Sequence, residues 1–161
     1  MSRLQSSTST AGVIMSSIDC IDEIGINAPI EKVFETVKDY PSWTRWNPAY
    51  KCQLLNTQDV VEGSEIRHQY GDNPFLRSEF VRRIDKIESP AKLEESYISG
   101  PIIGKGTWHI KESNGRTTVA FHCQVKGNNA LSKLVFKLSG ARSHKAVYAG
   151  ILRKLKNFCE Q

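Results

Sequence analysis

Residues 26–48, INAPIEKVFETVKDYPSWTRWNP, constrain the fold of this chain more than any other stretch. Pro29 suits the first turn of a helix, because its missing N–H has no intrahelical partner at that position. Val33, Phe34 and Val37 then recur at helical spacing, and charged residues occupy the other faces. The stretch therefore predicts the end of a strand followed by an amphipathic helix.

A second short helix follows within the same stretch. Pro41 interrupts the first helix, and Trp43 and Trp46 then lie three positions apart on one face of the next turn. This run resembles the opening of the START-like (SRPBCC) helix-grip superfamily, in its polyketide cyclase/dehydrase-like and coenzyme Q-binding-like branch. Later motifs of that superfamily recur at 104–108 (GKGTW) and 114–121 (NGRTTVAF). The resemblance implies a curved sheet gripping a long helix, with a deep cavity for apolar ligands.

Segments that alternate apolar and polar residues fill the middle of the chain. Apolar residues of one parity predict a half-buried strand over 18–26. The pair Asn114-Gly115 is a strong type I′ hairpin signal, and Ile87 is out of phase in its segment, which predicts a β-bulge. We expect six further strands in one antiparallel meander, at about 50–57, 64–71, 78–88, 92–99, 105–113 and 116–126.

The hydrophobic period changes from about Asn129 onward. Apolar residues then follow a 3.6-residue rhythm to near the C-terminus, which predicts one long helix. Gly140 and Gly150 weaken this helix and predict a kink or a close approach to the sheet. A curved sheet needs cover on one face, and only this helix is long enough to supply it. The order predicts an α+β helix-grip fold, β-α-α-β6-α with about seven strands, as a single domain over 16–161.

Charge and cysteine content narrow the possible functions. The net charge of +5 suits anionic membranes or nucleic acid, but the basic residues are spread along the chain, which favours a solvated surface. The four cysteines are widely separated, as expected of buried thiols in a reducing compartment. We expect a cytoplasmic protein with no metal and no cofactor. Residues 1–15 contain Arg3 as their only basic residue, so a flexible tail is favoured over a transit segment.

Polar residues on the inward faces of the predicted strands are the candidate functional residues. Parity places His68 and Tyr70 inward on one strand, Arg82 on the next, and Glu95 and Tyr97 on another. Because a buried charge must be paired, an Arg82–Glu95 ion pair is the favoured interpretation of this face. The alternative is a polar spot that orients a ligand, with His68, Tyr70, Arg82 and Tyr97 as candidates for acid–base catalysis.

An apolar ligand would lie between the sheet and the long helix. We expect Trp46 in the core and Trp43 nearer the cavity mouth. Ile102 and Ile103 are expected at a loop tip that gates the cavity or touches a membrane, or in a plain hairpin loop. The predicted ligand contacts are Trp43, His68, Tyr70, Phe80, Arg82, Glu95, Tyr97, Trp108, Phe121, Leu138 and Tyr148.

Two functions fit these predictions. The first is a non-catalytic carrier or sensor of a hydrophobic small molecule, such as a lipid, an isoprenoid or quinone, or a polyketide, with transient contact to a membrane surface. The second, implied by the resemblance, is a polyketide cyclase/aromatase/dehydratase-like enzyme. Nucleic-acid binding is disfavoured because aromatic and basic residues do not interleave. We favour the carrier, because one buried Arg–Glu pair does not supply an acid and a base poised for catalysis.

Overall fold

The computed structural model describes residues 17–161, except 72, 74, 76, 136 and 139–140. Its seven strands form one antiparallel sheet in the order β1-β7-β6-β5-β4-β3-β2. The predicted meander is confirmed, and β1 joins its far edge by pairing with β7. The strands are β1 (Ser17–Ile26), β2 (Tyr50–Leu54), β3 (Glu65–Tyr70), β4 (Ser78–Glu88), β5 (Lys92–Ser99), β6 (Ile102–Ser113) and β7 (Arg116–Gly127).

Helical segments lie between β1 and β2 and after β7. Where the sequence predicted one long C-terminal helix, the described residues form two, α2 and α3. Gly140 falls outside the described residues, and Gly150 marks no close approach, because a Cβ added there would meet no heavy atom within 4 Å. No helix of the described ranges combines the length and the apolar character needed to cross a bilayer. The helices are α1 (Ile30–Lys38), the 3-10 helix η1 (Tyr40–Arg45), α2 (Ala130–Val135) and α3 (Ala141–Cys159).

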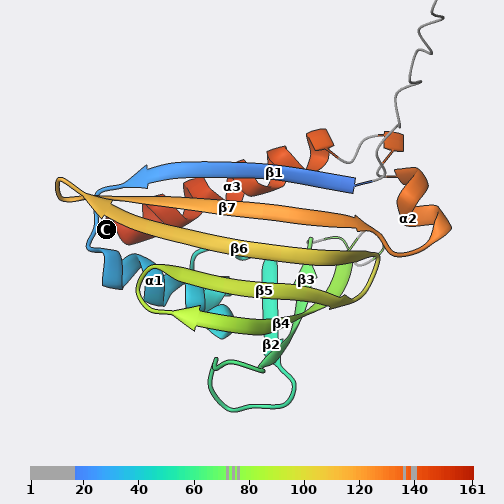
Figure 1. Ribbon diagram of the computed structural model, residues 1–161, viewed down its shortest axis with the longest axis horizontal. Helices are drawn as coiled ribbons and strands as arrows, with labels where there is room; N and C mark the ends of the chain where they lie inside the picture. Colours follow the sequence, from blue (N-terminus) through green and yellow to red (C-terminus); the bar gives the residue numbers. More distant parts are fainter. Residues whose placement is uncertain (1–16, 72, 74, 76, 136, 139–140) are drawn as a thin grey trace, which may run out of the picture.

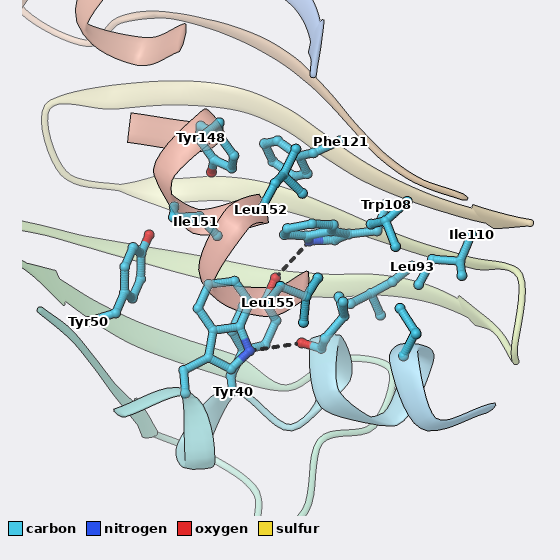
Figure 2. Packing of buried hydrophobic residues seen from close by; sticks show 14 of the residues in the cluster. Tyr40, Tyr50, Leu93, Trp108, Ile110, Phe121, Tyr148, Ile151, Leu152 and Leu155 are labelled. Carbon is cyan, nitrogen blue, oxygen red and sulfur yellow. Dashed lines mark hydrogen bonds between the residues drawn. The ribbon is translucent and has the colours of Figure 1, made fainter. Parts of the chain in front are cut away.

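The sheet curves around α3, which runs along one of its faces, while α1 and α2 lie at opposite ends (Figure 1). Alternate residues of β7 are buried, as the predicted strand parity requires. Figure 2 shows Tyr148, Leu152 and Leu155 of α3 beside Phe121 and Trp108 of the sheet. The rings of Phe121 and Tyr148 stack with centroids 4.3 Å apart. This α+β arrangement is the predicted helix-grip fold.

Local backbone signals in two places are confirmed. Asn114 and Gly115 have φ of 52° and 74°, and the residues that flank them pair across the β6–β7 hairpin. Both central residues of a type I′ turn need positive φ, which Asn and Gly tolerate best. The register of β4 against β5 shifts between Ile84 and Lys86, beside the position where Ile87 broke the alternation. The bulge lets one strand follow the curvature of the sheet.

Ile102 and Ile103 do not form a loop tip, contrary to expectation. They open β6, where they pair with the end of β7. The turn between β5 and β6 is shorter and is made by Gly100 and Pro101, with Gly100 at a φ of 114°. A Cβ on Gly100 would also lie 2.7 Å from the Cβ of Phe80, so glycine is required there on two grounds.

Trp43 of η1 and Trp46, the C-cap of that helix, lie in the core. Trp46 is buried, as predicted, but Trp43 is buried even more completely, at 1% exposure, and does not lie near a cavity mouth. The indole Nε1 of Trp43 donates to the Val37 carbonyl at 3.0 Å. Its ring also packs within 6.0 Å, centroid to centroid, of Tyr40, Trp46, Tyr50 and Trp108. Trp43 therefore anchors η1 to the sheet.

Candidate functional site

A cavity of about 440 Å³ lies between the sheet, α2 and α3. Aromatic and aliphatic side chains line most of it, as is usual for sites that bind small apolar molecules. A hollow of about 610 Å³ also lies between α1, η1 and residues 59–61, but charged side chains such as Glu35, Lys38 and Asp59 line it. We therefore take the first cavity as the candidate site.

A buried arginine marks the inner end of this cavity. Arg82 of β4 is 1% exposed and lies opposite Tyr97 of β5. Its Nη1 donates to the Glu95 carboxylate and, at 3.3 Å, to the Tyr40 hydroxyl. Its Nη2 donates to the hydroxyls of Tyr50 at 3.2 Å and Tyr148 at 2.9 Å. The predicted Arg82–Glu95 ion pair is confirmed, and it is the centre of a larger polar cluster.

The carboxylate of Glu95 is held by further donors. The Tyr40 hydroxyl donates to it at 2.5 Å, and the Trp108 Nε1 donates to Tyr40 at 3.1 Å. Burial raises the pKa of Glu95, while Arg82 and Tyr40 counteract that rise. Burial is the largest influence on Arg82 and lowers its pKa, but Glu95 and the hydroxyls of Tyr148, Tyr97 and Tyr50 together outweigh burial and hold the pKa of Arg82 well above its ordinary range. Arg82 and Glu95 thus carry opposite charges that cancel, so the pair contributes no net charge to the cavity.

Aromatic rings enclose the guanidinium. Its carbon lies 4.6 Å from the ring centroid of Tyr97 and 5.1 Å from that of Phe80, close enough for cation–π attraction. The Nε of Arg82 is buried and has no hydrogen-bond partner among the described residues. Arg82 therefore lines the cavity while its charge is shielded on several sides.

Tyrosine hydroxyls form the polar surface of the inner end. Tyr97 and Tyr148 are linked through their hydroxyls at 3.2 Å, and both line the cavity with Tyr50. Burial raises the pKa of all three phenols far above neutrality. A phenol that accepts a hydrogen bond from Arg82 still has its own proton to donate. The inner end can therefore donate hydrogen bonds to an oxygen of a bound molecule.

The two buried histidines occupy different places. His68 faces inward as predicted, but it stacks on Phe80 beneath the cavity and does not line it. Its Nδ1 lies 3.3 Å from the Cys52 Sγ, and burial lowers its pKa well below the ordinary value. His144 of α3 does line the cavity, and burial lowers its pKa to about 4. Both imidazoles are neutral at pH 7, and both Nε2 atoms lack a partner among the described residues.

A cluster of three polar side chains lies between β1 and α3. Cys20, Asp22 and His144 bring three possible ligand atoms within 4.8 Å of one another, close enough to hold a metal ion. The Cys20 Sγ lies 3.4 Å from the His144 Nδ1 and 4.0 Å from the Asp22 Oδ2. Burial raises the pKa of the Cys20 thiol, which keeps it protonated and weakens it as a ligand. Sequence spacing gave no sign of this group, because Cys20 and His144 are 124 positions apart.

The predicted ligand contacts fall into three sets. Those that line the cavity are Tyr70, Phe80, Arg82, Tyr97 and Tyr148. Those buried elsewhere, in the core or behind Arg82, are Trp43, His68, Glu95, Trp108 and Phe121. Leu138 is 77% exposed and does not line the cavity, so its prediction as a contact is wrong. The residues that sequence reasoning missed include Tyr50, Ile102, Leu131, Val135, His144 and Val147.

A family model described as polyketide cyclase / dehydrase and lipid transport matches residues 21–160. No relative was found among curated protein sequences. Among solved structures, the Zhui aromatase/cyclase from a Streptomyces species is similar at a TM-score of 0.70 and 15% identity, over 89% of this chain and 94% of that chain. A START superfamily protein from Mycobacterium smegmatis gives a TM-score of 0.68 and 15% identity, over 89% and 97%.

A major latex-like protein from Panax ginseng is similar at a TM-score of 0.66 and 14% identity, over 89% of this chain and 97% of that chain. At such low identity these likenesses concern the fold. They agree with the seven-stranded sheet and C-terminal helix described above. What each cavity holds depends on the side chains that line it.

Proposed function

Because the chain belongs to the polyketide cyclase / dehydrase and lipid transport family, we propose that it is a non-catalytic carrier or sensor of a hydrophobic small molecule. The molecule would lie in the cavity between the sheet and α3. The observation that carries this proposal is the pairing of a mostly apolar wall with a few hydrogen-bond donors at the inner end. Small-molecule sites combine these two features, with the polar groups fixing the orientation of the ligand.

The polar cluster narrows the chemistry of the ligand. The charge of Arg82 is already matched by Glu95, so an anionic headgroup would meet no free cation there. Tyr97 and Tyr148 share one hydrogen bond, so one of their two hydroxyl protons remains for a neutral oxygen acceptor such as a carbonyl, quinone or hydroxyl oxygen. The remainder of the ligand would be apolar and would extend along Phe80 and Ile102 towards α2. Lipids, isoprenoid quinones and polyketide-like molecules meet this description.

The ionisable groups favour binding over catalysis. A general acid or base works best when its pKa lies near the operating pH. The cavity phenols have pKa values far above 7, and His144 has one of about 4. His68, a predicted acid–base candidate, does not reach the cavity. These residues can hold a ligand in place but are poorly matched to proton transfer at neutral pH.

One observation supports the alternative of a polyketide cyclase/aromatase/dehydratase-like enzyme. The Nε2 of His144 is buried and has no hydrogen-bond partner within the described part of the chain, and its ring lines the same cavity as Arg82 and Tyr148. Donors at Tyr148 could polarise a ligand carbonyl while His144 accepted a proton. The low pKa of His144 makes it a weak base, so this function is the second candidate.

The proposal is tested by removing one donor from the cavity. Tyr148→Phe deletes a hydroxyl that contacts both Arg82 and Tyr97, whereas Tyr70→Phe is a matched control in the same wall. The probe is ubiquinone with a short isoprenoid tail, titrated by quenching of tryptophan fluorescence. We expect Tyr148→Phe to weaken binding by roughly three- to tenfold, the worth of one hydrogen bond, and Tyr70→Phe to change it little.

Equal binding by both variants and the parent protein would contradict the proposed orientation of the ligand. Turnover of a poly-β-ketone substrate that is lost in a His144→Gln variant would instead establish the enzymatic alternative. Both variants should first be shown to fold by circular dichroism, because Tyr148 is buried.

A further inference from the structure

Large apolar side chains are exposed at the α2 end of the molecule. Leu131 and Leu134 of α2 are 71% and 52% exposed, and Leu138 beyond it is 77% exposed. Phe75, in the connection between β3 and β4, is 94% exposed. Soluble proteins rarely gather such residues without a partner for them. We refer to Phe75, Leu131, Leu134 and Leu138 as the cavity-mouth surface.

This surface borders the open end of the ligand cavity. Leu131 both lines the cavity and is exposed to solvent. Tyr70 and Ser78, which flank the connection that carries Phe75, also line the cavity. Figure 1 shows α2 projecting beyond the end of β7, at the opposite end of the sheet from α1. An apolar molecule that entered or left past α2 would therefore pass this surface.

Charge is distributed unevenly along the chain, and five cations of its basic part lie near the end of β7, in or after α2, and at the start of α3. Between Glu112 and Glu160 there is no acidic residue, yet nine of the 22 Lys and Arg residues fall there. The rest of the chain holds all 17 acidic residues against the remaining 13 basic ones and is net negative. The basic residues are spread along the chain, as expected, but the acidic residues are not, and the moderate total charge conceals this asymmetry.

Five of these cations lie in the segments that carry or adjoin the cavity-mouth surface. Lys126 lies next to the last residue of β7, Lys133 lies within α2, and Lys137 follows it. Arg142 and Lys145 lie in the first turns of α3. None of the five takes part in an ion pair among the described residues, whereas lysines elsewhere, such as those of β4 and β5, do. Burial raises the pKa of Asp22, and Lys145 lies close enough to that carboxyl to counteract the rise. The charges of the other four are therefore available to a partner.

We infer that the cavity-mouth surface docks on an anionic lipid bilayer. Exposed leucines and a phenylalanine beside unpaired lysines are the features that hold an amphipathic segment at a membrane interface. Cations near an anionic leaflet gain attraction that falls off within a Debye length, while the apolar side chains enter the headgroup boundary. Docking in this orientation would place the cavity opening against the bilayer, so an apolar ligand could be exchanged without crossing water.

The inference is tested by sedimentation of the full-length protein with vesicles. One set is made of equal parts phosphatidylcholine and phosphatidylserine, and the other of phosphatidylcholine alone. We expect binding to the anionic vesicles at low salt, weaker binding as salt rises, and little binding to the neutral ones. Equal binding to both sets, or none to either, would overturn the inference.

Paired variants identify the surface that binds. Leu134→Ser with Leu138→Ser removes two apolar residues that do not line the cavity, and Ile21→Ser, at 61% exposure on β1, is the control. We expect the double variant to lower the partition coefficient at least tenfold and the control to leave it unchanged. Lys133→Gln with Lys137→Gln should lower it roughly tenfold. Loss of binding in the Ile21 variant alone would refute the assignment.

A protein partner is the competing occupant. Sedimentation velocity measures whether the protein self-associates. If Leu134→Ser abolished self-association and the parent protein bound no vesicles, the surface would be assigned to a second copy of the chain, and the inference would be overturned. Because the varied residues lie outside the cavity, ubiquinone titration of the same variants should be unchanged. Loss of docking with retained ligand binding therefore separates this inference from the proposed function.

Discussion

Replacing Glu95 with Gln removes the negative charge that faces the Arg82 guanidinium and changes almost nothing in shape. The side chains of the pair are 0% and 1% exposed, so water cannot take over the role of the lost charge. Leaving one member of a buried pair uncompensated typically costs about 3–5 kcal/mol. We expect a value within this range, because the Gln amide oxygen can still accept from Arg82, but the Gln NH2 group replaces the carboxylate oxygen that accepted from Tyr40.

Urea denaturation followed by tryptophan fluorescence measures this change directly. Total stability of a domain is about 5–15 kcal/mol, so a loss of this size is easily resolved. Glu79→Gln is the matched control, because Glu79 is a half-exposed member of a 3.6 Å ion pair with Arg67, and its replacement should cost less than about 1 kcal/mol. An Arg82→Met/Glu95→Gln double variant should recover part of the loss, since it leaves no buried charge.

A cost below about 1 kcal/mol for Glu95→Gln would refute the reasoning. It would mean that solvent or a bound molecule compensates the positive charge of Arg82 more than Glu95 does. Unchanged stability together with weakened ubiquinone binding would mean that the cluster serves ligand recognition in place of stability.

Two further outcomes follow from buried groups. His144 has a pKa of about 4 when folded against an ordinary value of 6.5, so only the unfolded chain takes up its proton between those pH values. His144→Gln should therefore reduce the loss of stability on acidification below pH 6.5, by up to about 1.4 kcal/mol per pH unit. Urea titrations at pH 7 and pH 5 compare the variant with the parent protein, and an equal loss of stability in both would contradict this prediction. Leu155→Ala should lower the free energy of unfolding by about 2–5 kcal/mol, because Leu155 is fully buried under the sheet. The control Leu134→Ala, at an exposed position, should lower it by less than about 0.5 kcal/mol. Similar losses in the two variants would show that α3 does not pack as described.

The strand faces could be predicted because the side-chain period of a strand is fixed at two. Once the segment boundaries were known, His68, Arg82, Glu95 and Tyr97 had to share the inward face, and all four are buried. Pairing between Arg82 and Glu95 followed from the cost of an isolated buried charge, not from any motif. Whether an inward side chain reaches the cavity, however, depends on which neighbours cover it. His68 points inward but is covered by Phe80, so it does not line the cavity.

The errors arose where the period of the backbone is not constant. Trp43 lies in a 3-10 helix and Trp46 is the C-cap of that helix. Its three residues per turn bury both side chains, so spacing could not rank them. The glycines around Ile102 concealed an early start to β6. A continuous helical rhythm over Leu131 to Leu155 gave no sign that α2 and α3 are separate, and so placed exposed Leu138 in the cavity. Tyr50 and His144 reach the site only through tertiary contacts.

Native mass spectrometry of the freshly purified protein, followed by solvent extraction, shows whether the cavity carries an apolar ligand. We predict a stoichiometric adduct that dissociates on activation and is extracted as an apolar molecule with a carbonyl, quinone or hydroxyl oxygen. Adding ubiquinone to protein that carries no adduct should produce a one-to-one complex, weakened by Tyr148→Phe. A protein that carries no adduct and binds neither ubiquinone nor other apolar carbonyl compounds at the cavity would contradict this prediction.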